Sequence, residues 1–274
     1  MNKRSFIKNV GVMSAAFSAG FVRLQQAVAA VEHVPAAALA ANEEFWRKVR
    51  DDYRIKPDYI NLENGYYCFL PEQTLEDLID HMRAVNYEGS YYMRTVQFDN
   101  KKKVADSVAA IVGCTAEEVA ITRNTTESLD LIIGGIDWQA GDEAVMAEQD
   151  YGAMLNHFEL MERRYGIINK RVSVPNHPRD DNELVELYAS ALTGKTRLLM
   201  LSHMINITGH VLPVRKIVDM AHERGVEVMV DGAHAYSHVP FQMSDLGCDY
   251  YGTSLHKWLS APLGSGMLYV KKDK

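Results

Sequence analysis

Residues 226–257, VEVMVDGAHAYSHVPFQMSDLGCDYYGTSLHK, decide the fold class of this chain. Two runs rich in apolar residues, at 226–231 and 248–254, predict short buried strands. Each run ends in polar residues, which are Asp231, His234, Ser254, His256 and Lys257. In open parallel sheets ligands bind at the carboxyl ends of the strands. The two clusters therefore predict a site at one edge of a sheet.

The same alternation continues towards the N-terminus. Apolar residues at helical spacing predict helices at 43–53, 72–88, 98–112, 126–136, 153–165, 182–192 and 214–224. Further strands are predicted at 118–122, 143–148, 168–174, 197–203 and 266–271. Strands that alternate with helices indicate an α/β domain with a mostly parallel sheet flanked by helices. We find no internal repeat, and the Ala-rich stretch 27–41 is typical of a linker.

The polar residues at the strand ends suit a pyridine-ring cofactor. Lys257 is a candidate for a Schiff base with a carbonyl group, and Asp231 could keep a ring nitrogen protonated. Thr125 and Thr126 begin a predicted helix, where free backbone N–H groups and hydroxyls can hold a phosphate. The remaining candidates are Tyr151 for stacking, Asn206 and His234 for a phenolic oxygen, and Ser254 and His256 for further phosphate contacts.

Each of these motifs has a simpler structural interpretation when taken alone. Asp-Gly-Ala-His is more often a strand end and turn than a cofactor clamp. Asn-Thr-Thr-Glu is an ordinary helix cap with an acid in the first turn. A single histidine is usually a hydrogen-bonded structural residue. Only the occurrence of several clusters in one order favours a site.

Four segments in that order resemble a known family. "NTTESLD", "SHMINITGHVLPV", "MVDGAHA" and "TSLHKWLSAPLGSG" are similar to motifs of the class V pyridoxal-phosphate aminotransferases, the branch of isopenicillin-N epimerases and cysteine desulfurases. The resemblance spans 59–271 and implies the large domain of a fold type I enzyme with pyridoxal 5'-phosphate as cofactor. It implies that Lys257 forms the Schiff base, that Asp231 pairs with the pyridine nitrogen, and that the other candidates take the roles given above.

Two departures bear on the reaction. Desulfurases have His where this chain has Tyr151, and Gln where it has His234, and both differences favour the epimerase-like subgroup. We expect an enzyme that acts on an amino acid or amine, with Lys257 moving a proton at the α-carbon. Epimerisation, transamination and elimination stay open. The alternatives are a C–S or C–N lyase similar to the desulfurases, and a cofactor-binding domain without activity. The family also implies a homodimer.

The family continues past the lysine into a small C-terminal domain, whereas this sequence stops at "MLYVKKDK". We expect 59–274 to be the large domain and the small domain to be absent. The family's substrate-binding arginine therefore has no assigned counterpart; Arg94 and Arg123 are candidates. Residues 61–71, "NLENGYYCFLP", resemble the loop over the family's active site, and an edge strand with a turn is the alternative.

The first thirty residues differ from the rest of the chain. They carry basic residues, a Gly/Ala/Ser-rich apolar stretch and AVAA, which together predict a signal peptide at 1–30. "NKRSFIKN" resembles the twin-arginine export motif, with Lys3 replacing the first arginine. We therefore expect an exported or periplasmic protein, with 31–58 as linker and N-terminal helix. A cytoplasmic protein with a disordered or membrane-lying N-terminal helix is the alternative. We expect no membrane-spanning helix.

Composition excludes several classes. The net charge is −7, with 29 basic and 36 acidic residues, so we expect no nucleic-acid partner. The three cysteines are widely spaced and odd in number, which argues against a disulfide framework and a zinc site. We expect no metal centre and interpret the cysteines as small buried residues.

Overall fold

The computed structural model describes residues 26 and 28–274, and its centre is a seven-stranded sheet. The strand order is β1-β7-β6-β5-β4-β2-β3. The strands are β1 (Val119–Thr122), β2 (Glu143–Ala147), β3 (Ile168–Val172), β4 (Thr196–Ser202), β5 (Glu227–Asp231), β6 (Tyr250–Ser254) and β7 (Gly266–Val270). All seven lie within one or two residues of the strands predicted from the sequence.

Only β7 runs against the other strands. It pairs antiparallel with β1 and with β6, whereas every other neighbouring pair is parallel. The carboxyl ends of the remaining six strands therefore meet at one edge of the sheet. The expectation of an α/β fold with a mostly parallel sheet is confirmed.

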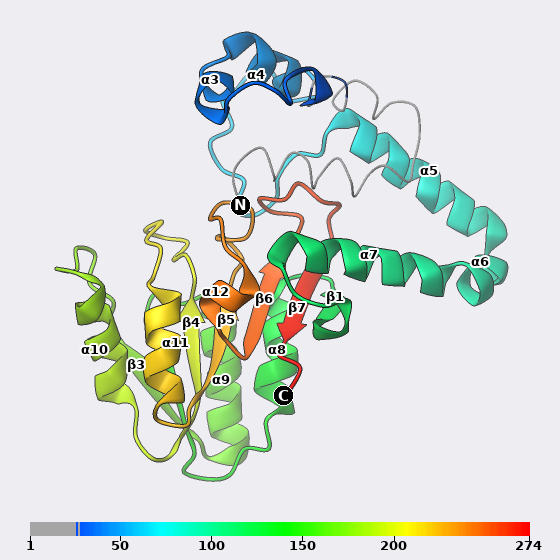
Figure 1. The fold of residues 1–274 in the computed structure, drawn as a ribbon. Coiled ribbons are helices and arrows are strands. Elements are labelled where there is room, and N and C mark those ends of the chain that lie inside the picture. The colour runs from blue at the N-terminus through cyan, green and yellow to red at the C-terminus, as the bar shows by residue number, and fades with distance from the viewer. Residues whose placement is uncertain (1–25, 27) are drawn as a thin grey trace.

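Helices cover both faces of the sheet (Figure 1). They are α7 (Gln97–Val112), α8 (Thr125–Gly135), α9 (Gly152–Tyr165), α10 (Asp181–Ala191), α11 (Val214–His222) and α12 (Met243–Leu246). Alternate residues of β4 enter different cores: Leu199 packs with α10 and α11, and Met200 packs with α8 and α9. Such strands are buried on both faces, which explains their continuous apolar sequences.

Helices α5 (Glu72–Glu88) and α6 (Ser90–Thr95) project from the sheet domain, as Figure 1 shows. Neither contains a buried residue. The Ala-rich stretch expected as a linker contains α3 (Ala36–Ala40), followed by α4 (Glu43–Arg50). Alanine has the highest intrinsic helix propensity, and the indole of Trp46 donates to the carbonyl of Leu39 at 3.0 Å, so this short helix can form.

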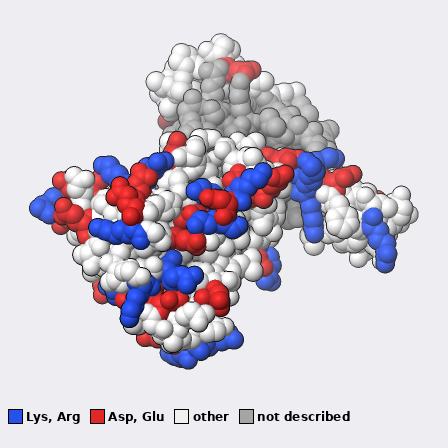
Figure 2. Space-filling view, turned by 60° about the horizontal axis from the view of Figure 1, so that its bottom comes forward, with Lys and Arg blue, Asp and Glu red and all other residues white. Residues whose placement is uncertain are grey.

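The predicted signal peptide falls on 1–30, of which 1–25 and 27 lie outside the described residues. Within the described part of the chain, no helix has the length and apolar character needed to cross a membrane. Acidic and basic side chains are interspersed on the face in Figure 2, without a broad patch of one sign.

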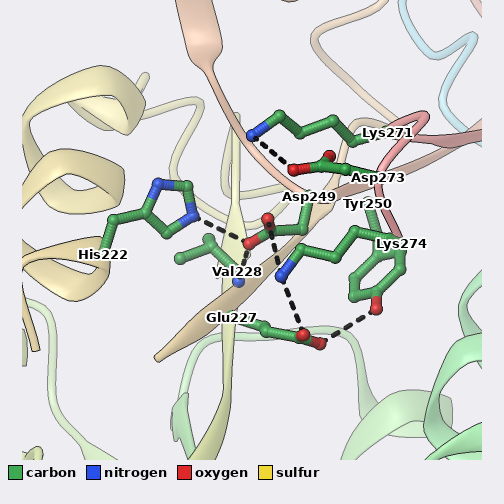
Figure 3. A network of polar contacts seen from close by, with 8 residues as sticks. All are labelled: His222, Glu227, Val228, Asp249, Tyr250, Lys271, Asp273 and Lys274. Atoms are coloured by element: carbon green, nitrogen blue, oxygen red, sulfur yellow. Dashed lines mark hydrogen bonds and ion pairs between the residues drawn. The ribbon is translucent and has the colours of Figure 1, made fainter. Parts of the chain in front are cut away.

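A polar network closes the edge of the sheet opposite the carboxyl ends (Figure 3). Asp249, 1% exposed, accepts hydrogen bonds from the backbone N–H of Val228 and from His222 Nε2, both at 2.8 Å. Lys274 Nζ lies 3.5 Å from the second oxygen of Asp249 and 2.8 Å from Glu227. The network joins the start of β5 and β6 to the residues after β7.

The contact between β6 and α8 provides a test of this packing. A Cβ atom at Gly252 would lie 2.7 Å from Leu129 Cδ2 and 3.0 Å from Ser128 Cβ. We expect Gly252→Ala to lower the free energy of unfolding in urea by about 1–3 kcal/mol, because a well-packed core resists added atoms. Gly135 is on α8, the helix that carries Leu129 and Ser128, and has open space around it. Gly135→Ala should leave stability unchanged or raise it; equal losses in both variants would contradict this packing.

Candidate active site

The polar residues predicted at the strand ends gather around Lys257. A turn holds this lysine after β6: its backbone N–H donates to Ser254 O at 3.4 Å, and its carbonyl accepts from Ser260 N at 3.1 Å. Lys257 Nζ lies 3.3 Å from Nε2 of His234, which follows β5. Burial lowers the pKa of the Lys257 amine, against the opposing attraction of Asp231 and Glu63. A partly buried amine of this kind is more readily deprotonated than a surface lysine.

Asp231 is the last residue of β5 and is 7% exposed. Its Oδ1 accepts a hydrogen bond from Ala233 N at 2.9 Å. Burial raises the pKa of this carboxyl, and the Ala233 N–H and the Lys257 amine oppose that rise. With one backbone donor and one nearby amine, Asp231 can accept a further cationic partner such as a protonated ring nitrogen.

A second buried carboxyl, Asp150, lies beside this group. It accepts from Ala147 N at 2.7 Å and from the Ser202 hydroxyl at 2.6 Å. Ser202 and Asp231 are paired residues of β4 and β5. Burial raises the pKa of Asp150 to about 7, and the negative charge of Asp231 contributes to the rise. Near neutral pH Asp150 therefore carries a proton in a large fraction of molecules.

The predicted phosphate-binding residues meet at the first turn of α8. Thr125 N donates to the Ser254 hydroxyl at 2.9 Å, and the two hydroxyl oxygens are 2.8 Å apart. Asn124 caps the helix by accepting from Glu127 N at 2.8 Å. Thr126 is the next residue of the same turn. The hydroxyls at a helix N-terminus make a suitable environment for a phosphate.

The remaining predicted site residues are His256, Tyr151 and Asn206. His256 is 7% exposed and its Nδ1 lies 3.1 Å from Ser265 O, so Nδ1–H donates and Nε2 is left for another partner. Tyr151 precedes α9 with a side chain 46% exposed, and Asn206 is exposed on the loop after β4. Among the described residues, no hydrogen bond joins either side chain to Lys257, so their roles stay predictions.

Residues 61–71 form a loop that packs against the site, and the alternative of an edge strand is not observed. A Cβ atom at Gly65 would lie 2.8 Å from Cε1 of His234. Glu63 accepts from the backbone N–H of Gly65, and Cys68 N donates to His256 O at 3.0 Å. A side chain at position 65 would therefore displace the Glu63 carboxylate and the His234 ring.

No observed contact joins either candidate arginine, Arg94 or Arg123, to Lys257. Arg123 forms an ion pair with Glu127 in the first turn of α8 at 3.0 Å, and its side chain is 76% exposed. Arg94 is exposed on α6. A substrate carboxylate would have to displace Glu127 to bind Arg123, so neither of the two arginines offers a preformed carboxylate clamp.

Sequence reasoning gave no role to three residues that the structure places at the site. Asp150 lies just after the predicted strand 143–148, but its contact with Ser202 depends on sheet pairing. Glu63 lies on the early loop and reaches the site only through the fold. Trp258 follows Lys257 directly, and its indole Nε1 lies 3.4 Å from His234 Nδ1. Adjacency to Lys257 was the one signal available for Trp258.

Comparison with known proteins agrees with this geometry. The family model "Aminotransferase class-V" matches residues 70–274. An isopenicillin N epimerase of Amycolatopsis lactamdurans is 30% identical over 233 residues, which are 84% of this chain and 58% of that protein. A cysteine desulfurase of Haloferax volcanii is 30% identical over 222 residues, covering 78% of this chain and 51% of that protein.

A solved structure of a C-DES mutant, with glycine covalently linked to its pyridoxal-phosphate cofactor, is also similar. The TM-score is 0.74 at 26% identity, and the match covers 82% of this chain and 60% of that chain. The chain thus spans about half to three fifths of the length of the proteins it matches.

The raised pKa of Asp150 predicts a pH dependence of stability. Its pKa is about 7 in the folded protein, against 3.8 for a free carboxyl. Between these values the folded state binds more protons, so this group lowers stability as the pH rises from about 4 to 7. Asp150→Asn removes the ionisable group and with it this loss of stability. Each unit by which the pKa is raised corresponds to about 1.4 kcal/mol of folding free energy.

We therefore expect the free energy of unfolding of Asp150→Asn, relative to wild type, to increase between pH 4.5 and pH 7.5 in urea titrations. Asp58 is exposed, and its side chain pairs with Lys56 on the surface. Asp58→Asn should show no comparable trend. A pH-independent difference between Asp150→Asn and wild type would contradict the shifted pKa.

Proposed function

Because the chain belongs to the class-V aminotransferase family, whose members depend on pyridoxal phosphate, we propose that it binds this cofactor and acts on an amino acid or amine. The observation that carries the proposal is the partly buried amine of Lys257. Its Nζ lies 3.3 Å from Nε2 of His234, and the negative charge of Asp231 attracts it electrostatically. These groups come from neighbouring parallel strands and meet at one edge of the sheet.

The residues present fit the chemical groups of the cofactor. An aldehyde requires an amine, which Lys257 offers, and a pyridine nitrogen requires a buried carboxylate, which Asp231 offers. A phosphate suits the first turn of α8, where Thr125 and Ser254 place two hydroxyls 2.8 Å apart. We therefore assign Lys257, Asp231, Thr125 and Ser254 to the cofactor, with Thr126, Tyr151, Asn206, His234 and His256 as the further predicted contacts.

When bound, pyridoxal phosphate supplies an aldehyde and an electron-withdrawing ring. Asp231 holds a proton on the ring nitrogen, since a carboxylate buried next to that nitrogen stabilises the cationic form. Lys257 takes a proton from the substrate α-carbon and can return it. Its lowered pKa serves this role, because a base works best when its pKa is near the working pH.

Proton transfer at the α-carbon, in an epimerase or transaminase, is the reaction we favour. Tyr151 and His234 replace residues typical of desulfurases, and an isopenicillin N epimerase is among the relatives. Two of the three cysteines, Cys114 and Cys248, also give no activated thiolate. Burial raises the pKa of Cys114 to about 11 and that of Cys248 to about 12, so both remain protonated at neutral pH.

C–S bond cleavage is the second candidate, favoured by the similar cysteine desulfurase and by a similar structure described as the cystine C–S lyase C-DES with its product cysteine persulfide. A domain that binds the cofactor without turnover is the third candidate.

The first test is an absorption spectrum of the purified protein with added pyridoxal phosphate. We expect a visible band that survives dialysis in wild type and is absent in Lys257→Ala. Lys170, on β3, pairs at 2.7 Å with Glu143, the first residue of β2, so Lys170→Ala is a matched lysine control that should keep the band. Folded wild-type protein without a band would refute the cofactor assignment.

The loaded protein then separates the three candidates. Exchange of the α-proton of an amino acid in deuterated water, without sulfide or ammonia, indicates epimerisation or transamination. Release of sulfide from cysteine or cystine indicates the lyase. A stable band without exchange or release under any amino acid indicates the inactive domain.

We also propose that the chain forms a homodimer through α5 and its neighbours. No residue of the seventeen-residue helix α5 is buried, although this segment carries large apolar side chains. Met82 is 63% exposed, Tyr87 92%, Tyr91 68% and Phe98 69%. Apolar side chains clustered in this way are typical of a surface that a partner covers.

Sedimentation velocity should show a dimer of the 30.8 kDa chain. Tyr87→Glu should weaken dimerisation about tenfold or more, because it places a charge among apolar contacts. Leu131 is 55% exposed on α8, away from this segment, and Leu131→Glu should leave the dimer intact. A monomeric wild type, or equal effects of both substitutions, would contradict this interface.

A further inference from the structure

Trp258 is held in place between two histidines. Its indole Nε1 lies 3.4 Å from Nδ1 of His234, and the two rings meet edge to face with centroids 6.3 Å apart. The ring of His238 lies against Trp258 at a centroid distance of 3.6 Å. His238 Nδ1 in turn lies 2.9 Å from His234 O, so its N–H donates to that carbonyl. The position of the indole N–H is thereby fixed relative to His234.

This contact determines which nitrogen of His234 carries hydrogen. An indole N–H can only donate a hydrogen bond, so Nδ1 of His234 must accept. A neutral imidazole has one donor and one acceptor nitrogen, which leaves the hydrogen on Nε2. Burial and the neighbouring Lys257 lower the pKa of His234 to about 4, so the neutral ring is the form present near pH 7.

The Nε2–H of His234 then faces Lys257 Nζ at 3.3 Å. An ammonium group has no lone pair and cannot accept a hydrogen bond, whereas a neutral amine can. The tautomer fixed by Trp258 therefore stabilises the neutral amine relative to the ammonium form. In the other tautomer Nε2 would accept, and the contact would stabilise the ammonium instead.

Other charged groups act on the same amine. The carboxylates of Asp231 and Glu63 favour the ammonium form, and burial disfavours it. His256, on the same turn, and His238, beyond Trp258, are the nearby histidines. Because these influences oppose one another, a single hydrogen bond of about 1 kcal/mol can shift the balance measurably.

We propose that Trp258 is a positioning residue which acts through His234 to keep the Lys257 amine neutral, with its lone pair available to attack an aldehyde. The inference rests on the proposed function in one respect, namely that Lys257 reacts with an aldehyde. In that reaction the amine lone pair forms a C–N bond, and the two amine hydrogens leave with the aldehyde oxygen as water. Only the neutral amine can begin the reaction.

The test compares Trp258→Phe with wild type and with Trp46→Phe. Phenylalanine keeps an aromatic ring against His238 and removes the N–H. Trp46 also donates its indole N–H, to Leu39 O at 3.0 Å, but lies outside the site and serves as the matched control. Nitrogen NMR of the histidine rings reports the tautomer directly, and loss of one signal in His234→Gln identifies His234.

The second readout is the pH dependence of the reaction of Lys257 with pyridoxal phosphate, trapped by borohydride and located by mass spectrometry. We expect wild type and Trp46→Phe to show the Nε2–H tautomer and the same midpoint. Trp258→Phe should show a mixture of tautomers and a midpoint raised by about 0.5–1 pH unit, corresponding to the loss of one hydrogen bond.

The outcomes separate the two proposals. Absence of trapping at Lys257 in folded wild type refutes the proposed function. Trapping in wild type with an unchanged midpoint in Trp258→Phe refutes the role of Trp258. If Trp258→Phe does not fold, the wild-type spectrum alone still decides, because an Nδ1–H tautomer of His234 overturns the inference.

Discussion

The burial of the Asp231 carboxylate is the constraint on which the site depends. A carboxylate that is 7% exposed is stable only when charges and donors around it compensate for lost water. Here one backbone N–H donates to Asp231 at 2.9 Å, and the Lys257 amine lies nearby, so the compensation is only partial. Burial raises the pKa of the neighbouring Asp150 as well, and the negative charge of Asp231 adds to that rise. The site therefore contains two carboxyls whose ionisation is disfavoured by burial, and a cationic partner would favour the charged form of Asp231.

The parallel direction of β5 and β6 explains why Asp231 and Lys257 lie close together, and why their proximity can be predicted from the sequence. Asp231 pairs with Gly252, so the residues after β5 and β6 emerge side by side at the carboxyl edge. Apolar runs reveal such strands without knowledge of the fold, because both faces are buried. The pairing of Thr125 with Ser254 follows from the same geometry, since β6 packs against α8. These parts of the site could be predicted.

The features that were not predicted depend on side-chain contacts between segments that sequence patterns treat separately. The role of Asp150 depends on the pairing of β4 with β5, which brings Ser202 into line with Asp231. The approach of Gly65 to His234 depends on a loop without periodic pattern. Helix α6 and the four-residue α12 are too short for a helical period to be visible. The sequence therefore predicts the strand ends better than it predicts the surrounding contacts.

A comparison of two buried carboxylates separates the functional edge of the sheet from the structural one. Asp249, at the opposite edge, accepts hydrogen bonds on one oxygen from a backbone N–H and from His222, and its other oxygen forms an ion pair with Lys274 at 3.5 Å (Figure 3). Asp231 has one backbone donor and an amine whose own pKa is lowered by burial. A buried carboxylate with partners on both oxygens stabilises the fold. A buried carboxylate with fewer partners can still bind a cationic ligand. By this criterion the carboxyl edge is the edge at which a cationic ring nitrogen would bind.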